Sequence, residues 1–288
     1  MIEVSTPAPS ARVSPLRQKL LTEIRVRHFS PRTEEAYVHA IVELAAHCRC
    51  SPDQLDYDDV VGFLESCVSE RKLSRSTVNV YFQACRFLYE QVLKRDRLAF
   101  TLPRRSRPRT RPQILSPEEV LRLINAPENL KHKALLHMTY GSGLRVSEVV
   151  RLLPQHIEAE RMMLFVKSGK GHKDRYTLLS QTALEITRAY WRAFRPAHWL
   201  FPGRDDSRPM TEATAQQIYH QALAKSGVRK IGGIHTLRHC FATHHMENGV
   251  DLYAIKRFLG HTSIATTSRY MHVRQERLRK VVSPLDMP

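Results

Sequence analysis

The chain has 288 residues, of which 42% are hydrophobic, and a chain of this length more often forms two domains than one. Its 45 lysines and arginines outnumber its 28 aspartates and glutamates and give a net charge of +17 at pH 7. Such an excess favours a polyanionic partner, nucleic acid before an acidic membrane surface, and argues against an enzyme for small neutral substrates.

Apolar runs and cysteines narrow the class further. No apolar run approaches the roughly 18 residues of a membrane span, and the first 17 residues lack the apolar stretch of a secretory signal. We therefore expect a soluble, intracellular protein. The five cysteines are an odd number without a CxxC pair, which argues against a disulfide framework and against a structural zinc site.

The first block, residues 14–98, follows a flexible start at residues 1–13 and is predicted to be helical. Helix-capping signals occur at Ser14-Pro15, at Ser30-Pro31, at Ser51-Pro52 with Gln54, and at Ser74. Apolar residues recur at helical spacing after them. We expect four helices with an apolar core.

A basic interdomain linker is predicted at residues 99–115. Pro103, Pro108 and Pro112 keep it extended rather than helical. Two interpretations are open: a solvated linker, or a strap that lies on a phosphate backbone. Its candidate backbone contacts are Arg104, Arg105, Arg107, Arg109 and Arg111.

The second block, residues 116–274, combines helices with a hairpin and is followed by a tail at residues 275–288. Ser116 and Glu119 form a capping box that starts a helix. Residues 161–167 and 174–179 are predicted to pair around a glycine-containing turn. The predicted fold class is therefore mainly α with a small antiparallel β-sheet.

Polar side chains at the ends of these elements are candidates for chemistry. Arg145 enters an apolar helix after a Gly-Ser-Gly turn, where a guanidinium needs an anion, either a ligand or a structural carboxylate such as Glu148. Lys170 lies at the hairpin tip between two glycines, which would allow a close approach to a phosphate. Most lysines in such turns are only solvated.

A predicted helix in residues 232–245 carries a cationic face. At 100° per residue, His235, Arg238 and His239 share one side, and apolar residues occupy the other. This face is either a solvated surface or a phosphate-handling site. A zinc-protease motif is excluded because Thr236 stands where HExxH requires glutamate.

Two further candidates lie towards the C-terminus, His261 in an LGH motif and Tyr270 in a Ser/Thr-rich segment. A tyrosine in such a segment either packs with its hydroxyl in water or acts as a nucleophile. The second role requires cationic neighbours, because a phenol with a pKa near 10 attacks slowly unless its charge is stabilised.

Together these motifs resemble the tyrosine recombinase (phage-integrase) family. The family positions occur in order, in the contexts GLRVSE, GKGHKDR, HTLRH, LGH and TTSRYMH, and the resemblance covers nearly the whole chain. It implies a two-domain DNA clamp, with a helical core-binding domain and an α+β catalytic domain. The matching residues are Arg145, Lys170, His235, Arg238, His261 and Tyr270.

The resemblance also implies a mechanism. Tyr270 would attack a DNA phosphodiester and form a 3′-phosphotyrosyl link, while the two arginines hold the non-bridging oxygens. Lys170 would protonate the departing 5′-oxygen, His235 would accept or relay the tyrosine proton, and His261 would hydrogen-bond the phosphate. No metal, ATP or other cofactor would be required.

The partners implied are double-stranded DNA and further copies of the chain. A homotetramer would form on synapsed sites from chains that are monomers or dimers in solution. Lys173 and Arg175 join the linker arginines as candidate DNA backbone contacts. A cytoplasmic, nucleoid-associated protein without membrane contact is expected.

The first helices and the SPLD near the end resemble integron integrases, but residues 177–233 are too few for their added helical insertion. We therefore favour a recombinase of a mobile element, with Xer-type dimer resolution next. A type IB topoisomerase and a catalytically inactive DNA-binding regulator are the alternatives outside recombination.

Overall fold

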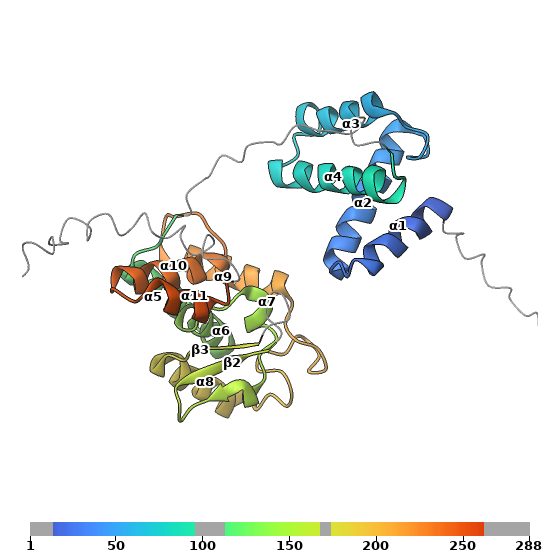
Figure 1. Ribbon diagram of the computed structural model, residues 1–288. Coiled ribbons are helices and arrows are strands. Elements are labelled where there is room, and N and C mark those ends of the chain that lie inside the picture. The colour runs from blue at the N-terminus through green and yellow to red at the C-terminus, as the bar shows by residue number, and fades with distance from the viewer. Residues whose placement is uncertain (1–13, 96–112, 168–173, 262–288) are drawn as a thin grey trace, which may run out of the picture. The chain divides into compact units, whose positions relative to one another are not determined.

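The computed structural model describes residues 14–95, 113–167 and 174–261 (Figure 1). The chain divides into two compact units, residues 1–108 and residues 109–288. Each unit has its own apolar core. None of the described helices is both long and apolar enough to cross a lipid bilayer.

The first unit contains four α-helices in its described residues, as the capping signals predict. The side chains of Ser14, Ser30 and Ser74 each accept a hydrogen bond from the backbone N–H three residues later. Buried side chains such as Leu44 and Phe63 fill the space between the helices. The elements are α1 (Pro15–Val26), α2 (Pro31–Cys48), α3 (Tyr57–Ser69), α4 (Arg75–Phe87) and a π-helical turn, η1 (Leu88–Val92).

The start of α3 differs from the prediction. Ser51-Pro52 with Gln54 predicts a helix that begins there, but the helix begins at Tyr57. Asp56 caps it by accepting from the Asp59 backbone N–H, and the Asp59 carboxylate accepts from the Asp56 backbone N–H. This reciprocal box satisfies two backbone donors at once, which explains why it, and not the serine signal, sets the start of the helix.

The second unit combines helices with a three-stranded antiparallel sheet. The predicted hairpin is present, with Met163 opposite Leu178 and Val166 opposite Arg175. A two-residue strand, β1 (Ile157–Glu158), pairs with β2 (Met163–Val166) and is too short to predict from alternation. In chain order the elements are α5 (Pro117–Asn125), α6 (Leu130–Gly141), α7 (Val146–Val149), a 3-10 turn η3 (Pro154–His156), β1 (Ile157–Glu158), β2 (Met163–Val166), β3 (Arg175–Leu178), α8 (Gln181–Phe194), α9 (Glu212–Ser226), α10 (His235–Glu247) and α11 (Leu252–Leu259).

Helix α10, which carries the HTLRH motif, is buried on both sides at its centre. Helices α5, α6 and α11 pack around it. On the side predicted to be cationic, Arg238 is only 2% exposed and Ala242 is fully buried, whereas His235 in the first turn is exposed. The interpretation of this face as a solvated surface is therefore wrong at Arg238.

A buried hydrogen-bond chain fixes α10 to its neighbours. His244 Nε2 lies 2.9 Å from the Leu115 carbonyl oxygen, and its Nδ1 lies 2.8 Å from the Tyr140 hydroxyl. Because the carbonyl can only accept, Nε2 donates to it, and Nδ1 pairs with the tyrosine hydroxyl. These hydrogen bonds join α10 to α6 and to Leu115, which lies just before the cap of α5.

The turn between α6 and α7 depends on Gly143. This residue has φ +61°, and a Cβ added to it would lie 2.5 Å from Cδ1 of Phe241 on α10. The turn can therefore lie against α10 only where no side chain intervenes.

We predict that Gly143→Ala lowers the free energy of unfolding more than Gly227→Ala does. Gly227 ends α9 at φ +70° with no atom within 4 Å of an added Cβ, so alanine there meets only left-handed strain, about 1 kcal/mol. Alanine at Gly143 adds the clash with Phe241 to the same strain. Urea unfolding of the intact chain measures both losses, and equal losses would contradict the packing of this turn on α10.

Candidate active site around a buried carboxylate

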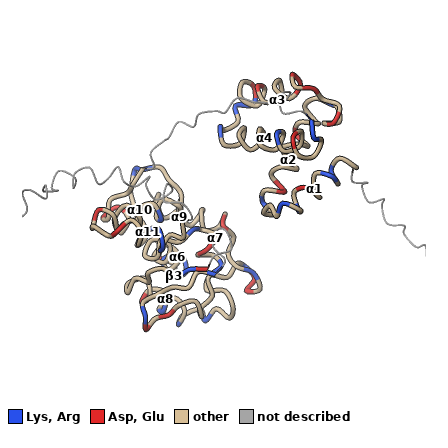
Figure 2. The backbone as a smooth tube through the Cα atoms, in the orientation of Figure 1, with Lys and Arg blue, Asp and Glu red and all other residues tan. Residues whose placement is uncertain are grey.

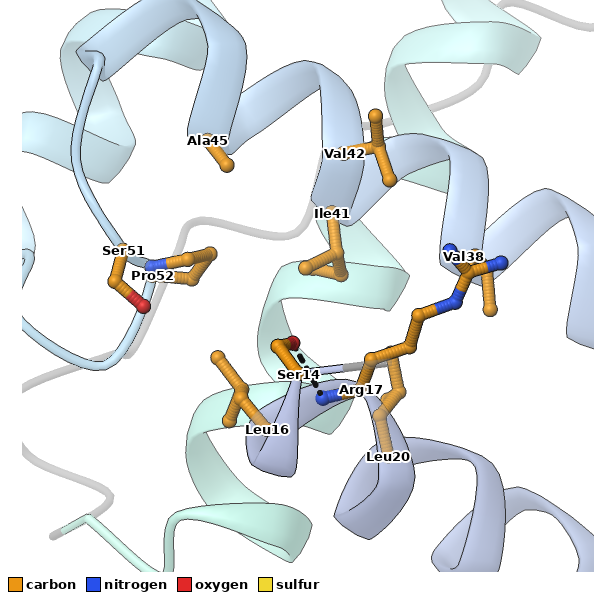
Figure 3. Close-up of a pocket in the computed structure, with 10 residues that line it drawn as sticks. All are labelled: Ser14, Leu16, Arg17, Leu20, Val38, Ile41, Val42, Ala45, Ser51 and Pro52. Atoms are coloured by element: carbon orange, nitrogen blue, oxygen red, sulfur yellow. Dashed lines mark hydrogen bonds between the residues drawn. The ribbon is translucent and has the colours of Figure 1, made fainter. Parts of the chain in front are cut away.

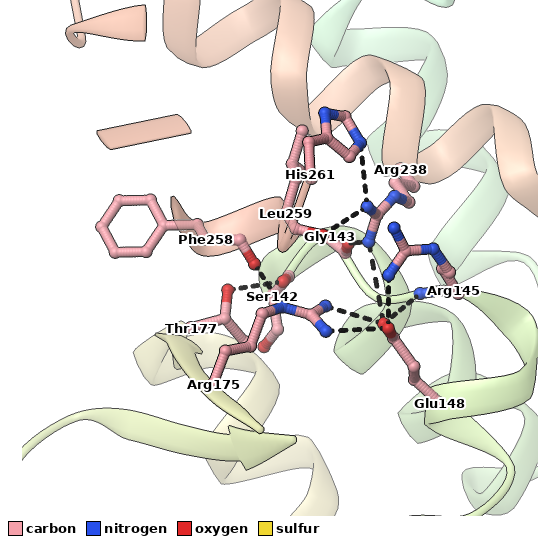
Figure 4. A network of polar contacts seen from close by, with 10 residues as sticks. All are labelled: Ser142, Gly143, Arg145, Glu148, Arg175, Thr177, Arg238, Phe258, Leu259 and His261. Carbon is pink, nitrogen blue, oxygen red and sulfur yellow. Dashed lines mark hydrogen bonds and ion pairs between the residues drawn. The ribbon is translucent and has the colours of Figure 1, made fainter. Parts of the chain in front are cut away.

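The centre of the site is Glu148, the third residue of α7, whose side chain is 5% exposed. Its carboxylate accepts hydrogen bonds from Arg145 Nη1 at 2.7 Å and from the Arg145 backbone N–H at 2.8 Å. Nη1 and Nη2 of Arg175 each donate to one of its oxygens at 2.8 Å. Arg238 Nη1 lies 3.7 Å from it (Figure 4). Three guanidinium groups therefore surround one carboxylate.

These contacts keep Glu148 ionised. Burial by itself would raise the pKa of the carboxyl, but the hydrogen bonds and charge of Arg175, the Arg145 backbone N–H and the Arg238 charge lower it to about 2. At neutral pH the cluster holds three positive charges and one negative charge, so positive charge remains for a further anion.

Arg145 is the cluster arginine most exposed to solvent. It occupies the N-cap position of α7, and its side chain is 17% exposed, compared with 9% for Arg175 and 2% for Arg238. One of its guanidinium nitrogens, Nη1, donates a hydrogen bond to the Glu148 carboxylate. Among the described residues, none accepts a hydrogen bond from the other two. A partly buried guanidinium with donors to spare can bind an anion.

Arg238 is held by backbone carbonyls from two directions. Nη1 donates to the Gly143 carbonyl at 2.7 Å, and Nη2 donates to the Leu259 carbonyl at 2.6 Å. Nη2 also lies 3.1 Å from His261 Nε2. The turn before α7 and the end of α11 thus set the direction of this guanidinium.

His261 is neutral in this environment. Burial lowers its pKa, and the charges of Arg238, Arg145 and Arg175 lower it further, to about 3. Because a guanidinium can only donate, His261 Nε2 is the acceptor in its contact with Arg238, so Nδ1 carries the proton. Nδ1 of His261 is therefore an N–H donor.

His235 and His239 lie one helical turn apart on α10. Their ring centroids are 5.0 Å apart in an edge-to-face arrangement. Desolvation lowers the pKa of His235, and the charges of Arg238 and Arg145 lower it further. A neutral imidazole can accept a proton at physiological pH.

The structure brings together four of the six predicted catalytic residues. Arg145 and Arg238 meet at Glu148, His261 contacts Arg238, and the charges of both arginines act on His235. The other predicted site residues, Lys170, Tyr270, Lys173, Arg104, Arg105, Arg107, Arg109 and Arg111, lie outside the described residues.

Arg175 has partners that its local sequence does not predict. The sequence predicts a contact with the DNA backbone, but the guanidinium is bonded to Glu148. The sequence suggests only Arg145 as a partner of Glu148, whereas the carboxylate binds three arginines. The spacing of Arg145 and Glu148 suggests one of these pairs, while the other two join residues 27 and 90 positions away from Glu148.

Other parts of the described chain offer less chemistry. No three His, Cys, Asp or Glu side chains gather there in a way that would hold a metal ion. The first unit has a cavity of about 330 Å³, lined mainly by apolar residues of α1 and α2 such as Leu20, Val38 and Ile41 (Figure 3). Figure 2 shows acidic residues gathered around α3 of the same unit.

We predict that Glu148→Gln removes a pH-dependent part of the stability. The pKa of Glu148 falls from 4.5 to about 2 on folding, so its ionised form contributes stability that is complete above about pH 5 and is lost as the pH falls towards 2. The full contribution is of the order of 3 kcal/mol. Urea unfolding of wild type and variant should show a constant difference from pH 7 to 5 that narrows below about pH 4.5. A difference that stays constant down to pH 3 would contradict an ionised Glu148.

Comparison with known proteins places the chain in a family. The phage integrase family matches residues 113–277, and the N-terminal SAM-like domain of phage integrases matches residues 16–97. An integrase/recombinase of Sinorhizobium fredii is 38% identical over 276 residues, 96% of this chain and 90% of that protein. Tyrosine recombinase XerD of Rhizobium meliloti is 36% identical over 218 residues, 69% of this chain and 70% of that protein.

A solved structure shows the same fold. XerH site-specific recombinase, bound to a palindromic difH substrate after cleavage, aligns with a TM-score of 0.73 over 96% of this chain and 86% of that one, at 20% identity. The family match alone covers more than half of the chain. The chain therefore belongs to the phage integrase family of tyrosine recombinases, as its motifs predict.

Proposed function

We propose that this chain is a site-specific recombinase that cuts and rejoins double-stranded DNA through a 3′-phosphotyrosyl intermediate at Tyr270. The observation that carries the proposal is the excess of positive charge around Glu148, with two guanidinium nitrogens of Arg145 that donate to no described residue. Planar guanidinium groups match the non-bridging oxygens of a phosphodiester. Membership of the phage integrase family supports a DNA phosphate as the ligand.

The two arginines would act electrostatically. Arg238 is oriented by backbone carbonyls and Arg145 by Glu148, so both donors are in place before DNA binds. Negative charge on the non-bridging oxygens grows towards the transition state, and preorganised donors stabilise it without reorganisation. Removing one donor of this kind costs about 10²–10³ in rate.

In the proposed cleavage step, the Tyr270 oxygen bonds to phosphorus and the bond from phosphorus to the 5′-oxygen breaks. The phenolic proton passes to His235, whose lowered pKa leaves it neutral and able to accept. Lys170 gives a proton to the leaving 5′-oxygen. His261, with its proton on Nδ1, would donate a hydrogen bond to the phosphate.

The same groups would run the step in reverse. The phosphotyrosyl bond conserves the energy of the broken linkage, so a 5′-hydroxyl from another strand can attack it and reseal the DNA. The arginines supply the positive charge that metal ions supply in other phosphoryl-transfer enzymes. We therefore propose that neither a metal nor ATP takes part.

The biological setting proposed is a homotetramer on paired DNA sites in the cytoplasm, at the nucleoid, in the service of a mobile element. The S. fredii relative is named an integrase/recombinase, which supports recombination as the activity. Xer-type dimer resolution is the second candidate, because the R. meliloti relative is named XerD. The basic linker and Lys173 would bind the phosphate backbone in either case.

We predict that Tyr270→Phe abolishes covalent attachment to DNA while leaving DNA binding within about twofold, because only the attacking oxygen is removed. Nicked duplexes from the flanks of the chain's own gene are incubated with the protein in the presence of EDTA, denatured, and the attached DNA is sequenced. The adduct should fall by at least about a thousandfold.

The matched control is Tyr253→Phe, which alters an exposed tyrosine on α11 and should leave the adduct unchanged. An adduct that persists in Tyr270→Phe would contradict the assigned nucleophile. Scattered wild-type adducts with supercoil relaxation would indicate a topoisomerase, and tight binding without adducts would indicate a regulator.

A further inference from the structure

Arg175, the first residue of β3, is packed into the centre of the site. Its side chain is 9% exposed. Nη1 and Nη2 each donate to one oxygen of Glu148 at 2.8 Å, and Nε donates to the Phe258 carbonyl of α11 at 2.8 Å (Figure 4). Each of its three guanidinium nitrogens therefore has a protein acceptor, and little of the side chain reaches solvent.

The backbone at the end of α11 is shaped around this side chain. Gly260 has φ +61°, and a Cβ added there would lie 2.7 Å from Cδ of Arg175. Gly260 directly precedes His261, which contacts Arg238. Arg175 is thus packed against the turn that carries His261 and bonded to the carboxylate that holds Arg145.

The charge of Arg175 also matters to the other two arginines. With Arg175 present, Glu148 has a bidentate partner of its own, which leaves Arg145 and Arg238 an excess of positive charge. Without Arg175, the charge of the carboxylate would be compensated by those two guanidinium groups alone. Their donors would then be held more tightly by Glu148 and less available to a phosphate.

On the basis of the proposed function, we propose that Arg175 is a positioning residue that acts through Glu148. It fixes the carboxylate and offsets its charge, so that Arg145 and Arg238 are oriented to stabilise the scissile phosphate. Arg175 does not contact DNA in this role.

The test compares Arg175→Met, Arg175→Lys, Glu148→Gln and the double variant of Arg175→Met with Glu148→Gln. For each, we measure the single-turnover rate of adduct formation at saturating protein, the Kd for the same nicked duplex, and the dependence of Kd on salt. Arg161→Met is the matched control, because Arg161 lies beside the same sheet with its side chain 79% exposed.

Arg175→Met should slow adduct formation at saturation at least tenfold, with Kd changed less than twofold and the salt dependence unchanged. Arg175→Lys keeps the charge but cannot make both hydrogen bonds to Glu148, so its rate should lie between those of Arg175→Met and wild type. In the Glu148→Gln background, Arg175→Met should change the rate less than threefold, because its target is already neutral.

The opposite pattern would show that Arg175 is a DNA contact. Arg175→Met would then weaken binding equally in both backgrounds, lower the salt slope by about one, and leave the rate at saturation unchanged. An unchanged rate and an unchanged Kd would also overturn the proposal. If Arg175→Met alone fails to fold, a tenfold loss of rate on adding it to Glu148→Gln would overturn it.

Failure of the proposed function is visible separately. A wild-type chain that forms no adduct on any duplex would overturn that function and with it the catalytic part of Arg175. Urea unfolding of wild type, Arg175→Met, Glu148→Gln and the double variant would still report whether Arg175 and Glu148 are coupled, and additive losses would contradict the bidentate contact itself.

Discussion

One buried carboxylate with three guanidinium partners is the constraint on which the second unit depends. A single ion of either sign would be costly at this depth, but each member of the cluster is compensated by the others. Glu148 on α7 binds Arg145 from its own helix start, Arg175 from β3 and Arg238 from α10. The interaction that joins these elements also leaves an excess of positive charge. The ions that hold the second unit together are therefore the same ones that we propose bind the DNA phosphate.

The end of α11 completes the arrangement. Its last carbonyl groups have no partners within the helix, and two of them accept from cluster arginines: Phe258 from Arg175 and Leu259 from Arg238. Gly260 then turns the chain in the left-handed conformation that ends helices, which places His261 beside Arg238. The carbonyl groups at the end of α11 thus obtain cationic donors, and the two arginines obtain acceptors.

Much of this could be predicted from local sequence, because capping and pairing are local interactions. The structure contains the β2–β3 hairpin that the sequence predicts. Four predicted helix caps are also present, at Ser14, Ser30, Ser74 and Ser116. The predicted start of α3 is wrong because the capping box of Asp56, five residues beyond Ser51, provides more hydrogen bonds than the serine signal. Strand β1 was missed because two residues show no alternation.

The candidate site was predictable residue by residue but not as a network. Arg145, His235, Arg238 and His261 could be named because each lies in a short motif. The contacts from Glu148 to Arg175 and Arg238 could not, because they join residues 27 and 90 positions apart and nothing in a local pattern fixes which arginine meets which carboxylate. The burial of Arg175 is likewise set by α7 and α11, which lie far from β3 in sequence.

The central claim is that the arginines around Glu148 stabilise negative charge on the non-bridging oxygens of a DNA phosphate. The most direct measurement is adduct formation by Arg145→Ala on two versions of one duplex, with either a phosphate or an uncharged methylphosphonate at the cleavage position. If the arginine neutralises that charge, the variant should be about 10²–10³ slower than wild type on the phosphate and should recover most of the loss on the methylphosphonate. An equal deficit on both duplexes would contradict the claim.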